Sequence, residues 1–363
     1  MKVASSKIFG SLLSGLAFLA ASSAFAVTET PTANTLRITL VKDADGNFET
    51  FSTDSNGKRE GLTLGAVIRA SGQSLLEKKY EECKKSEPIT IFQEKDPQGT
   101  LVTYFVDAEG QKKRFLFKDV ISAIAGTITC SDTKTKQIDI KADRFMQLLL
   151  EKDSNGVLRG NIIHADGKKE LLNLGNLISS TAELAKDCKL GTEKERAIYI
   201  VFEKNPKINS NTTSIPAEAN GTTQAVLIDA FGNREELNLD NLLTAVSDSF
   251  MVCDANKNKP LAAAPTQPNI KLTLEKDASG SLHTYLTNSK GKKSDLSLGE
   301  LVSAAAGLSA CNSTEKEYNI DISFEKDTDG KVRTFVVDQY GQKKPFTLIG
   351  NILTTAYNIC SKN

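Results

Sequence analysis

Hydrophobic and polar residues alternate in short runs that recur along most of the chain. In the last recurrence Ile320, Ile322 and Phe324 stand at alternate positions, and a second alternating run follows the polar stretch 325–330. Alternation with a period of two is typical of β-strands with one buried face. The same order of events occurs six times, and each recurrence, here called unit 1 to unit 6, ends at a cysteine. The units cover residues 36–83, 89–130, 145–188, 198–253, 270–311 and 318–360.

Two turns separate three short strands in each unit. The first turn begins with Asp and ends with Gly in five units, as in Asp327 to Gly330, whereas unit 4 has a long Asn-, Pro-, Ser- and Thr-rich loop, Asn205 to Gly221. The second turn ends with Gly in all six units, as at Gly341. An Asp side chain bonds its own turn backbone, and Gly adopts positive φ without steric cost. These patterns predict β-hairpins.

The hydrophobic period changes after the third strand. In unit 6, Ile352 and Leu353 open an apolar run with small residues, and the other units continue in the same way. Such runs predict one amphipathic helix per unit. Each unit is therefore strand, strand, strand, helix, and the predicted fold class is α+β.

Odd and even units differ at the end of the third strand. The odd units share Leu-x-Leu-Gly, ending at Gly65, Gly175 and Gly299, and the even units lack this glycine. A unit of ~45 residues is too small to bury a stable core alone. We therefore expect six β-β-β-α repeats paired into three tandem domains, each with an antiparallel sheet and its helices on one face. The expected segments are a leader at 27–35, domains at 36–130, 131–253 and 269–363, and a Pro/Ala-rich linker at 254–268.

The first 26 residues have the pattern of an export signal. Lys2 and Lys7 precede a run of apolar and small residues, and Ala24-Phe25-Ala26 is a small-x-small cleavage site. The alternative is an uncleaved membrane anchor, but the apolar run is short of the ~20 residues that span a bilayer. We expect a periplasmic or secreted protein, cleaved near Ala26, with no transmembrane segment in the mature chain.

The six cysteines, one per unit, indicate disulfides in an exported chain. Pairwise duplication selects Cys83–Cys130, Cys188–Cys253 and Cys311–Cys360, each joining the helix ends of one domain. Metal binding is the alternative. It needs clustered thiolates, and no two cysteines are closer than the 47 positions from Cys83 to Cys130 (130 − 83).

Charge is balanced. Without Lys2 and Lys7 the chain has 43 basic residues (45 − 2) and 45 acidic ones, so nothing draws it as a whole to nucleic acid. A basic pair nevertheless follows the second turn in five units. The members of these pairs, candidate contacts to an anionic partner, are Lys58, Arg59, Lys112, Lys113, Lys168, Lys169, Lys292, Lys293, Lys343 and Lys344. The alternative is that lysines on an edge strand prevent aggregation between sheets.

Residues with catalytic or metal-binding chemistry do not recur. Asp43, Asp45 and Gly46 resemble the front of a calcium loop, but the bidentate acid at its twelfth position is missing, which favours plain turn chemistry. His164 and His283 lie near different turns of different units, which argues against a shared catalytic or metal role. We expect no cofactor and no metal.

Recurrence of scaffold residues without recurrence of catalytic types favours a non-enzymatic function. The sequence predicts an exported repeat protein that binds a macromolecular partner, either a protein or an anionic glycan or surface polymer, or that serves a structural or adhesive role at the cell envelope. Tandem copies gain affinity through effective concentration. The first alternative is an exported hydrolase inhibitor acting through the loop Asn205 to Gly221. A weaker alternative is an enzyme whose site lies between domains.

Overall fold

The structure is a computed structural model. It describes residues 35–45, 47–76, 88–95, 97, 101–107, 110–115, 144–152, 154, 158–185, 188–191, 196–204, 223–254, 256–279, 281–309, 316–326, 332–338, 341–345 and 349–359. The expected export signal, the loop Asn205 to Gly221 and the cysteines Cys83, Cys130, Cys311 and Cys360 lie outside these residues.

The described strands form six antiparallel three-stranded meanders, one in each unit. Their bounds are β1 Thr35–Lys42, β2 Phe48–Thr53 and β3 Arg59–Gly61; β4 Ile89–Lys95, β5 Leu101–Val106 and β6 Lys112–Arg114; β7 Met146–Lys152, β8 Leu158–His164 and β9 Lys169–Leu171; β11 Ile198–Lys204, β12 Thr223–Ile228 and β13 Arg234–Glu236; β15 Ile270–Lys276, β16 Leu282–Thr287 and β17 Lys293–Asp295; β18 Glu317–Lys326, β19 Val332–Val337 and β20 Lys343–Pro345. Two further short strands, β10 (Lys189–Leu190) and β14 (Met251–Val252), pair with each other.

A helix follows the third strand in five units. These helices are α1 Leu64–Leu76, α4 Leu174–Glu183, α5 Leu239–Phe250, α6 Leu298–Leu308 and α7 Gly350–Tyr357. The helix expected in unit 2 lies outside the described residues. The α+β class is confirmed.

Local turn and cap chemistry explains why these elements begin and end where they do. The glycine that closes the second turn has positive φ in every unit, between 76° and 85°. In unit 1 the Gly57 N–H donates to the Asp54 carbonyl (2.9 Å), and the Asp54 carboxylate accepts from the Lys58 N–H (3.0 Å). Helix α4 is capped by the Asn173 side chain, which accepts from the Asn176 N–H. The predicted turn chemistry is therefore confirmed at these positions.

The meanders join in pairs to form three six-stranded sheets. Sheet A has the order β20-β19-β18-β1-β2-β3, sheet B has β6-β5-β4-β7-β8-β9, and sheet D has β13-β12-β11-β15-β16-β17. The first strands of two units meet in the middle of each sheet, as in the ladder that pairs Ile38 of β1 with Ile320 of β18. Unit 1 therefore shares a sheet with unit 6, unit 2 with unit 3, and unit 4 with unit 5.

This pairing corrects the expected domain organisation. Every sheet joins units that the expected domains separate, so 36–130, 131–253 and 269–363 do not each contain a sheet of their own. The stretch 254–268 is not a linker between independent domains, because the units on its two sides share sheet D. It lies against the sheet: the Ala262 N–H donates to the Ala230 carbonyl (2.9 Å), and the Gln267 amide donates to Glu203 (2.6 Å).

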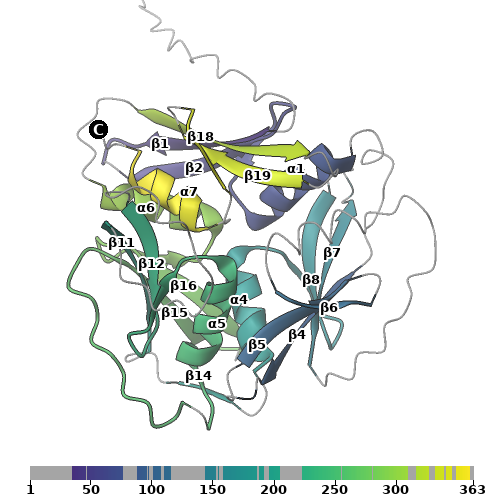
Figure 1. Cartoon of the computed structure of the whole chain (residues 1–363), viewed down its shortest axis with the longest axis vertical. Coiled ribbons are helices and arrows are strands. Elements are labelled where there is room, and N and C mark those ends of the chain that lie inside the picture. Colours follow the sequence, from purple (N-terminus) through teal and green to yellow (C-terminus); the bar gives the residue numbers. More distant parts are fainter. Residues whose placement is uncertain are drawn as a thin grey trace, which may run out of the picture.

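Helices pair as the sequence predicted, although the sheets do not. Helix α4 contacts α5, and α6 contacts α7. Each helix then packs on a sheet of other units: α1 on β8, α4 on β16, α6 on β2, α5 on β5 and α7 on β12. Figure 1 shows the three sheets around a centre that the helices occupy. One continuous hydrophobic core results, and it includes fully buried side chains of all three sheets, such as Ile38, Ile91 and Ile200.

Each Leu-x-Leu-Gly glycine lies against the backbone of another odd unit. A Cβ on Gly175 would lie 2.6 Å from the Leu296 carbonyl oxygen, one on Gly299 would lie 3.2 Å from that of Leu62, and one on Gly65 would lie 3.4 Å from that of Leu172. The contacts therefore run from unit 3 to unit 5, from unit 5 to unit 1 and from unit 1 to unit 3. They close a ring of odd units, and glycine is needed where the approach is tightest, at Gly175 and Gly299.

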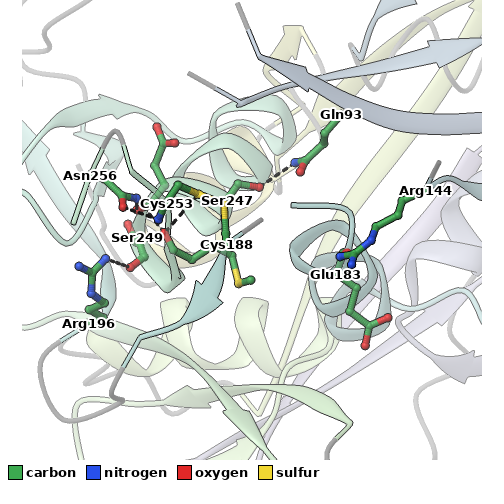
Figure 2. Close-up of a disulfide and its surroundings, with 11 residues drawn as sticks. Gln93, Arg144, Glu183, Cys188, Arg196, Ser247, Ser249, Cys253 and Asn256 are labelled. Atoms are coloured by element: carbon green, nitrogen blue, oxygen red, sulfur yellow. Dashed lines mark hydrogen bonds between the residues drawn. A yellow bond between two sulfur atoms is a disulfide. The ribbon is translucent and has the colours of Figure 1, made fainter. Parts of the chain in front are cut away.

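The disulfide Cys188–Cys253 confirms one predicted pair. It joins the chain just after α4 to the chain just after α5, and Figure 2 shows it among the polar contacts that hold this region. The Asn256 side chain accepts from the Cys253 N–H (2.8 Å), and the Arg196 guanidinium donates to the Ser249 carbonyl (3.0 Å). The bond therefore links two helices that pack together but cover different sheets. The other two predicted disulfides involve only cysteines outside the described residues.

Candidate functional site

The ten residues of the basic pairs lie at the outer edges of the three sheets. They lie in, or immediately before, β3 and β20 of sheet A, β6 and β9 of sheet B, and β17 of sheet D, and each of these is the last strand at its edge. They are spread over all three sheets rather than gathered in one patch. The prediction that they contact an anionic partner stays a prediction.

In all six units a cation stands two residues after the turn glycine, and in five of them a glutamate of the same sheet balances its charge. Ion pairs with a glutamate of the first strand occur in five units: Lys112–Glu94, Lys169–Glu151, Arg234–Glu203, Lys293–Glu275 and Lys343–Glu325. In unit 1 Val41 stands where the others have glutamate, and Arg59 lies over the Phe51 ring (4.1 Å). Lys293 also lies over an aromatic ring, Tyr285 (4.1 Å). The recurring feature is thus a cation bound within its own sheet.

The chain's two histidines meet in a groove between units 3 and 5. This histidine groove, with a volume of about 450 Å³, is lined by residues of the β8–β9 turn, α4 and the β15–β16 hairpin. His164 comes from the turn, Glu183 from the end of α4, and Asp277 and His283 from the hairpin. The close approach of Gly175 in unit 3 to the Leu296 carbonyl in unit 5 brings these elements together.

Carboxylates surround His164 inside the groove. Its Nε2 lies 3.6 Å from Glu170 and its Nδ1 lies 3.7 Å from Glu183, and Nε2 is buried without a hydrogen-bond partner in the described part of the chain. Burial raises the pKa of Glu183, and the nearby His164 opposes this rise only in part. Burial also acts to raise the pKa of Glu170, but the hydrogen bond from Lys168 and the charge of Lys168 hold that pKa below its usual value.

The hairpin wall carries a second histidine–carboxylate pair. His283 Nε2 lies 2.9 Å from Asp277. The Ser279 hydroxyl donates to Asp277 (2.6 Å), and this bond, with those from His283 and from the turn backbone, holds the pKa of Asp277 well below its usual value. Asp277 stays ionised at neutral pH, so the groove combines fixed acceptors with amine and hydroxyl donors.

A second groove, the unit 5–unit 1 groove, has a volume of about 480 Å³. It lies between the β16–β17 turn with α6 and the β1–β2 hairpin with β3. The Lys290 ammonium crosses it and donates to the Asn47 side chain (2.9 Å). Asp43 occupies the same hairpin position here as Asp277 does in the histidine groove, and Lys292 the same turn position as Lys168.

The two grooves share a hydroxyl pair at equivalent positions. Ser179 of α4 lies 2.9 Å from Thr284 of β16, and Ser303 of α6 lies 2.5 Å from Thr50 of β2. Because both threonines pair with equivalent strand positions, Leu274 and Leu40, the two grooves are copies of one junction between odd units.

Sequence reasoning treated the histidines as unrelated, and the structure places them in one groove. The turn of unit 3 reaches the hairpin of unit 5 only because the odd units form a ring, and no pairing of neighbouring units would bring them together. The shared Leu-x-Leu-Gly motif was the available signal. Among the described residues, no three His, Cys, Asp or Glu side chains are arranged to hold a metal ion.

No protein-family model, curated protein or solved structure matches this chain. None of the helices in the described ranges is long and apolar enough to cross a membrane. The disulfide is compatible with a periplasmic or extracellular protein.

Proposed function

We propose that the mature chain is an exported, non-enzymatic binding protein that displays one type of surface more than once to a macromolecular partner at the cell envelope. The observation that carries the proposal is the duplicated groove, built from equivalent elements at the unit 3–unit 5 and unit 5–unit 1 junctions. Two sites on one rigid core bind a repetitive partner with an effective concentration that raises affinity. A structural or adhesive role follows from the same multivalence.

The groove chemistry supports binding rather than turnover. Both shared hydroxyls, Ser179 and Ser303, lie against threonine hydroxyls instead of a histidine base. A serine nucleophile needs a base within hydrogen-bond reach. The histidines line one groove alone, whereas an Asp, a Lys and a Ser at equivalent positions line both.

The alternative is an inhibitor that inserts the loop Asn205 to Gly221 into a hydrolase. The ends of this insertion are held by β11 and β12, where Lys204 pairs with Thr223. A hairpin tip of this kind is the right place for an inhibitory loop. The loop itself lies outside the described residues.

Sedimentation of the mature protein with insoluble envelope material tests the proposal. A matched variant replaces 205–221 with the four-residue turn Asp153 to Gly156 from unit 3, which joins two strands in the same way. We expect saturable binding that this variant retains. Capture of a single hydrolase at one-to-one stoichiometry, lost in the variant, would establish the inhibitor instead.

A further inference from the structure

We infer that the histidine groove and the unit 5–unit 1 groove are two binding sites for segments of a neutral glycan, and that the third copy of the junction lacks the hydroxyl pair on which binding depends. This inference rests on the proposed binding function and names its ligand class. It follows from the shared frame, from the charge of the groove lining and from the substitutions at the third junction.

The shared frame suits a ligand whose groups both donate and accept hydrogen bonds. Each groove is lined by an ionised Asp as acceptor, a Lys as donor, and a Ser hydroxyl that does either and is paired with a Thr hydroxyl. In the histidine groove these are Asp277, Lys168 and Ser179, and the Ser179 hydroxyl is paired with the buried Thr284. Volumes of about 450 and 480 Å³ accommodate a small ligand segment. Sugar hydroxyls match such a mixed set of donors and acceptors.

An apolar side chain completes each groove. Leu282 lines the histidine groove, and Phe48 takes the same strand position in the other groove, where Phe51 also lines the surface. Sugar rings expose C–H faces as well as hydroxyls, so an apolar contact beside polar groups is complementary to them. A purely ionic ligand would leave these side chains unused.

The charge of the lining argues against an anionic ligand. The histidine groove has three carboxylates, Glu170, Glu183 and Asp277, against Lys168, a formal charge of −2 (−3 + 1) with neutral histidines. The other groove has three carboxylates against two lysines, a formal charge of −1 (−3 + 2), from Asp43, Glu49, Glu300, Lys290 and Lys292. The net negative charge of each lining repels an anionic ligand. For these two grooves, a neutral glycan therefore replaces the anionic glycan that the sequence led us to expect.

The third junction, between α1 and β8, differs from the other two at the positions of the hydroxyl pair. Arg69 stands where the other two helices have serine, and Gly160 stands where the other two strands have threonine. Arg69 is buried and forms an ion pair with Glu60. A hydroxyl pair cannot form there. The chain thus contains its own copy of the junction without the hydroxyl pair, and this copy is compatible with the fold.

The test places the arginine and the glycine of the third junction at the equivalent positions of the other two. The double substitution Ser179→Arg with Thr284→Gly closes the histidine groove, and Ser303→Arg with Thr50→Gly closes the other. Titration calorimetry with cellotetraose, maltotetraose and tetra-N-acetylchitotetraose measures the stoichiometry. We expect at least one of these probes to bind two sites in the wild type, one in either closed variant and none when all four substitutions are combined. A heparin tetrasaccharide should not bind the grooves.

The two histidines provide a readout that needs no mutation. They are the chain's only histidines, and both line the histidine groove, so their ring signals in NMR spectra of the untagged mature protein report on this groove. We expect both signals to shift with the bound probe, at the affinity measured by calorimetry. The inference is wrong if millimolar concentrations of all three probes leave both signals unchanged, or if the variant with both grooves closed binds like the wild type. If that variant still sediments with envelope material, the proposed function survives and the groove assignment fails.

Discussion

Replacement of Gly175 by alanine tests the ring of odd units directly. The Cβ of the new side chain would lie 2.6 Å from the Leu296 carbonyl oxygen, a distance that real Cβ atoms essentially never show. The obstacle is backbone of the adjoining unit, which cannot rotate away as a side chain does. Helix α4 and the end of β17 must therefore separate, and this loosens the junction that forms the histidine groove.

The expected magnitude follows from two opposing effects. Overpacking of a tight contact costs about 1–3 kcal/mol, whereas glycine-to-alanine replacement in a helix gains about 0.5–1 kcal/mol. The net loss should be about 1–2 kcal/mol for Gly175→Ala. Gly65→Ala should be near neutral, because its Cβ would lie 3.4 Å from the Leu172 carbonyl oxygen, which is ordinary contact. Gly307→Ala in α6 should stabilise, because nothing lies within 4 Å of the added atom.

Urea denaturation of the three variants and the wild type, with the disulfide intact, measures these differences. The predicted order of stability is Gly307→Ala, then Gly65→Ala, then Gly175→Ala. A Gly175→Ala protein as stable as Gly307→Ala would refute the close approach of units 3 and 5, and with it the ring.

Three further predictions concern the disulfide, the sheet edges and pH. Replacing Cys188 and Cys253 by serine opens a 65-residue loop and should lower the free energy of unfolding by roughly 4 kcal/mol in the chain-entropy model; an unchanged denaturation midpoint would show that the bond contributes nothing. Valine in place of Lys112, Lys293 and Lys343 removes recurring edge cations, and light scattering during refolding should then show more aggregation. The loss of each surface ion pair should lower the free energy of unfolding by only about 1 kcal/mol or less. Equal scattering would contradict the edge-protection role. Burial raises the pKa of Glu236 above its value in the unfolded chain, so the charged form of Glu236 destabilises the fold. The free energy of unfolding therefore falls as pH rises through the folded pKa. Glu236→Gln should therefore be more stable than the wild type at pH 7 and equal to it below the ordinary glutamate pKa of about 4.3, as thermal unfolding across pH would show; a gain that persists at low pH would contradict the charge argument.

Much of the local structure was predictable because it depends on neighbouring residues in the chain. The Asp and Gly positions at each turn predict the hairpins, and the Asp54 turn with Gly57 is a described example. One disulfide, Cys188–Cys253, was predictable from duplication alone, because duplicated units place their helix ends alike. The grooves were not predictable in this way, since their walls come from units that are not adjacent in sequence.

By itself the sequence determined the three-stranded meanders, the helix that follows them and the Cys188–Cys253 bond. Only the tertiary structure decided which units share a sheet and which helix covers which sheet. Every unit offers the same kind of first strand, so β1 could pair equally well with β4 or β18 as far as its alternating pattern is concerned. What decides is long-range packing: the described helices bury their apolar faces in one shared core, and the contacts at Gly65, Gly175 and Gly299 hold units 1, 3 and 5 against one another. In that arrangement β1 pairs with β18.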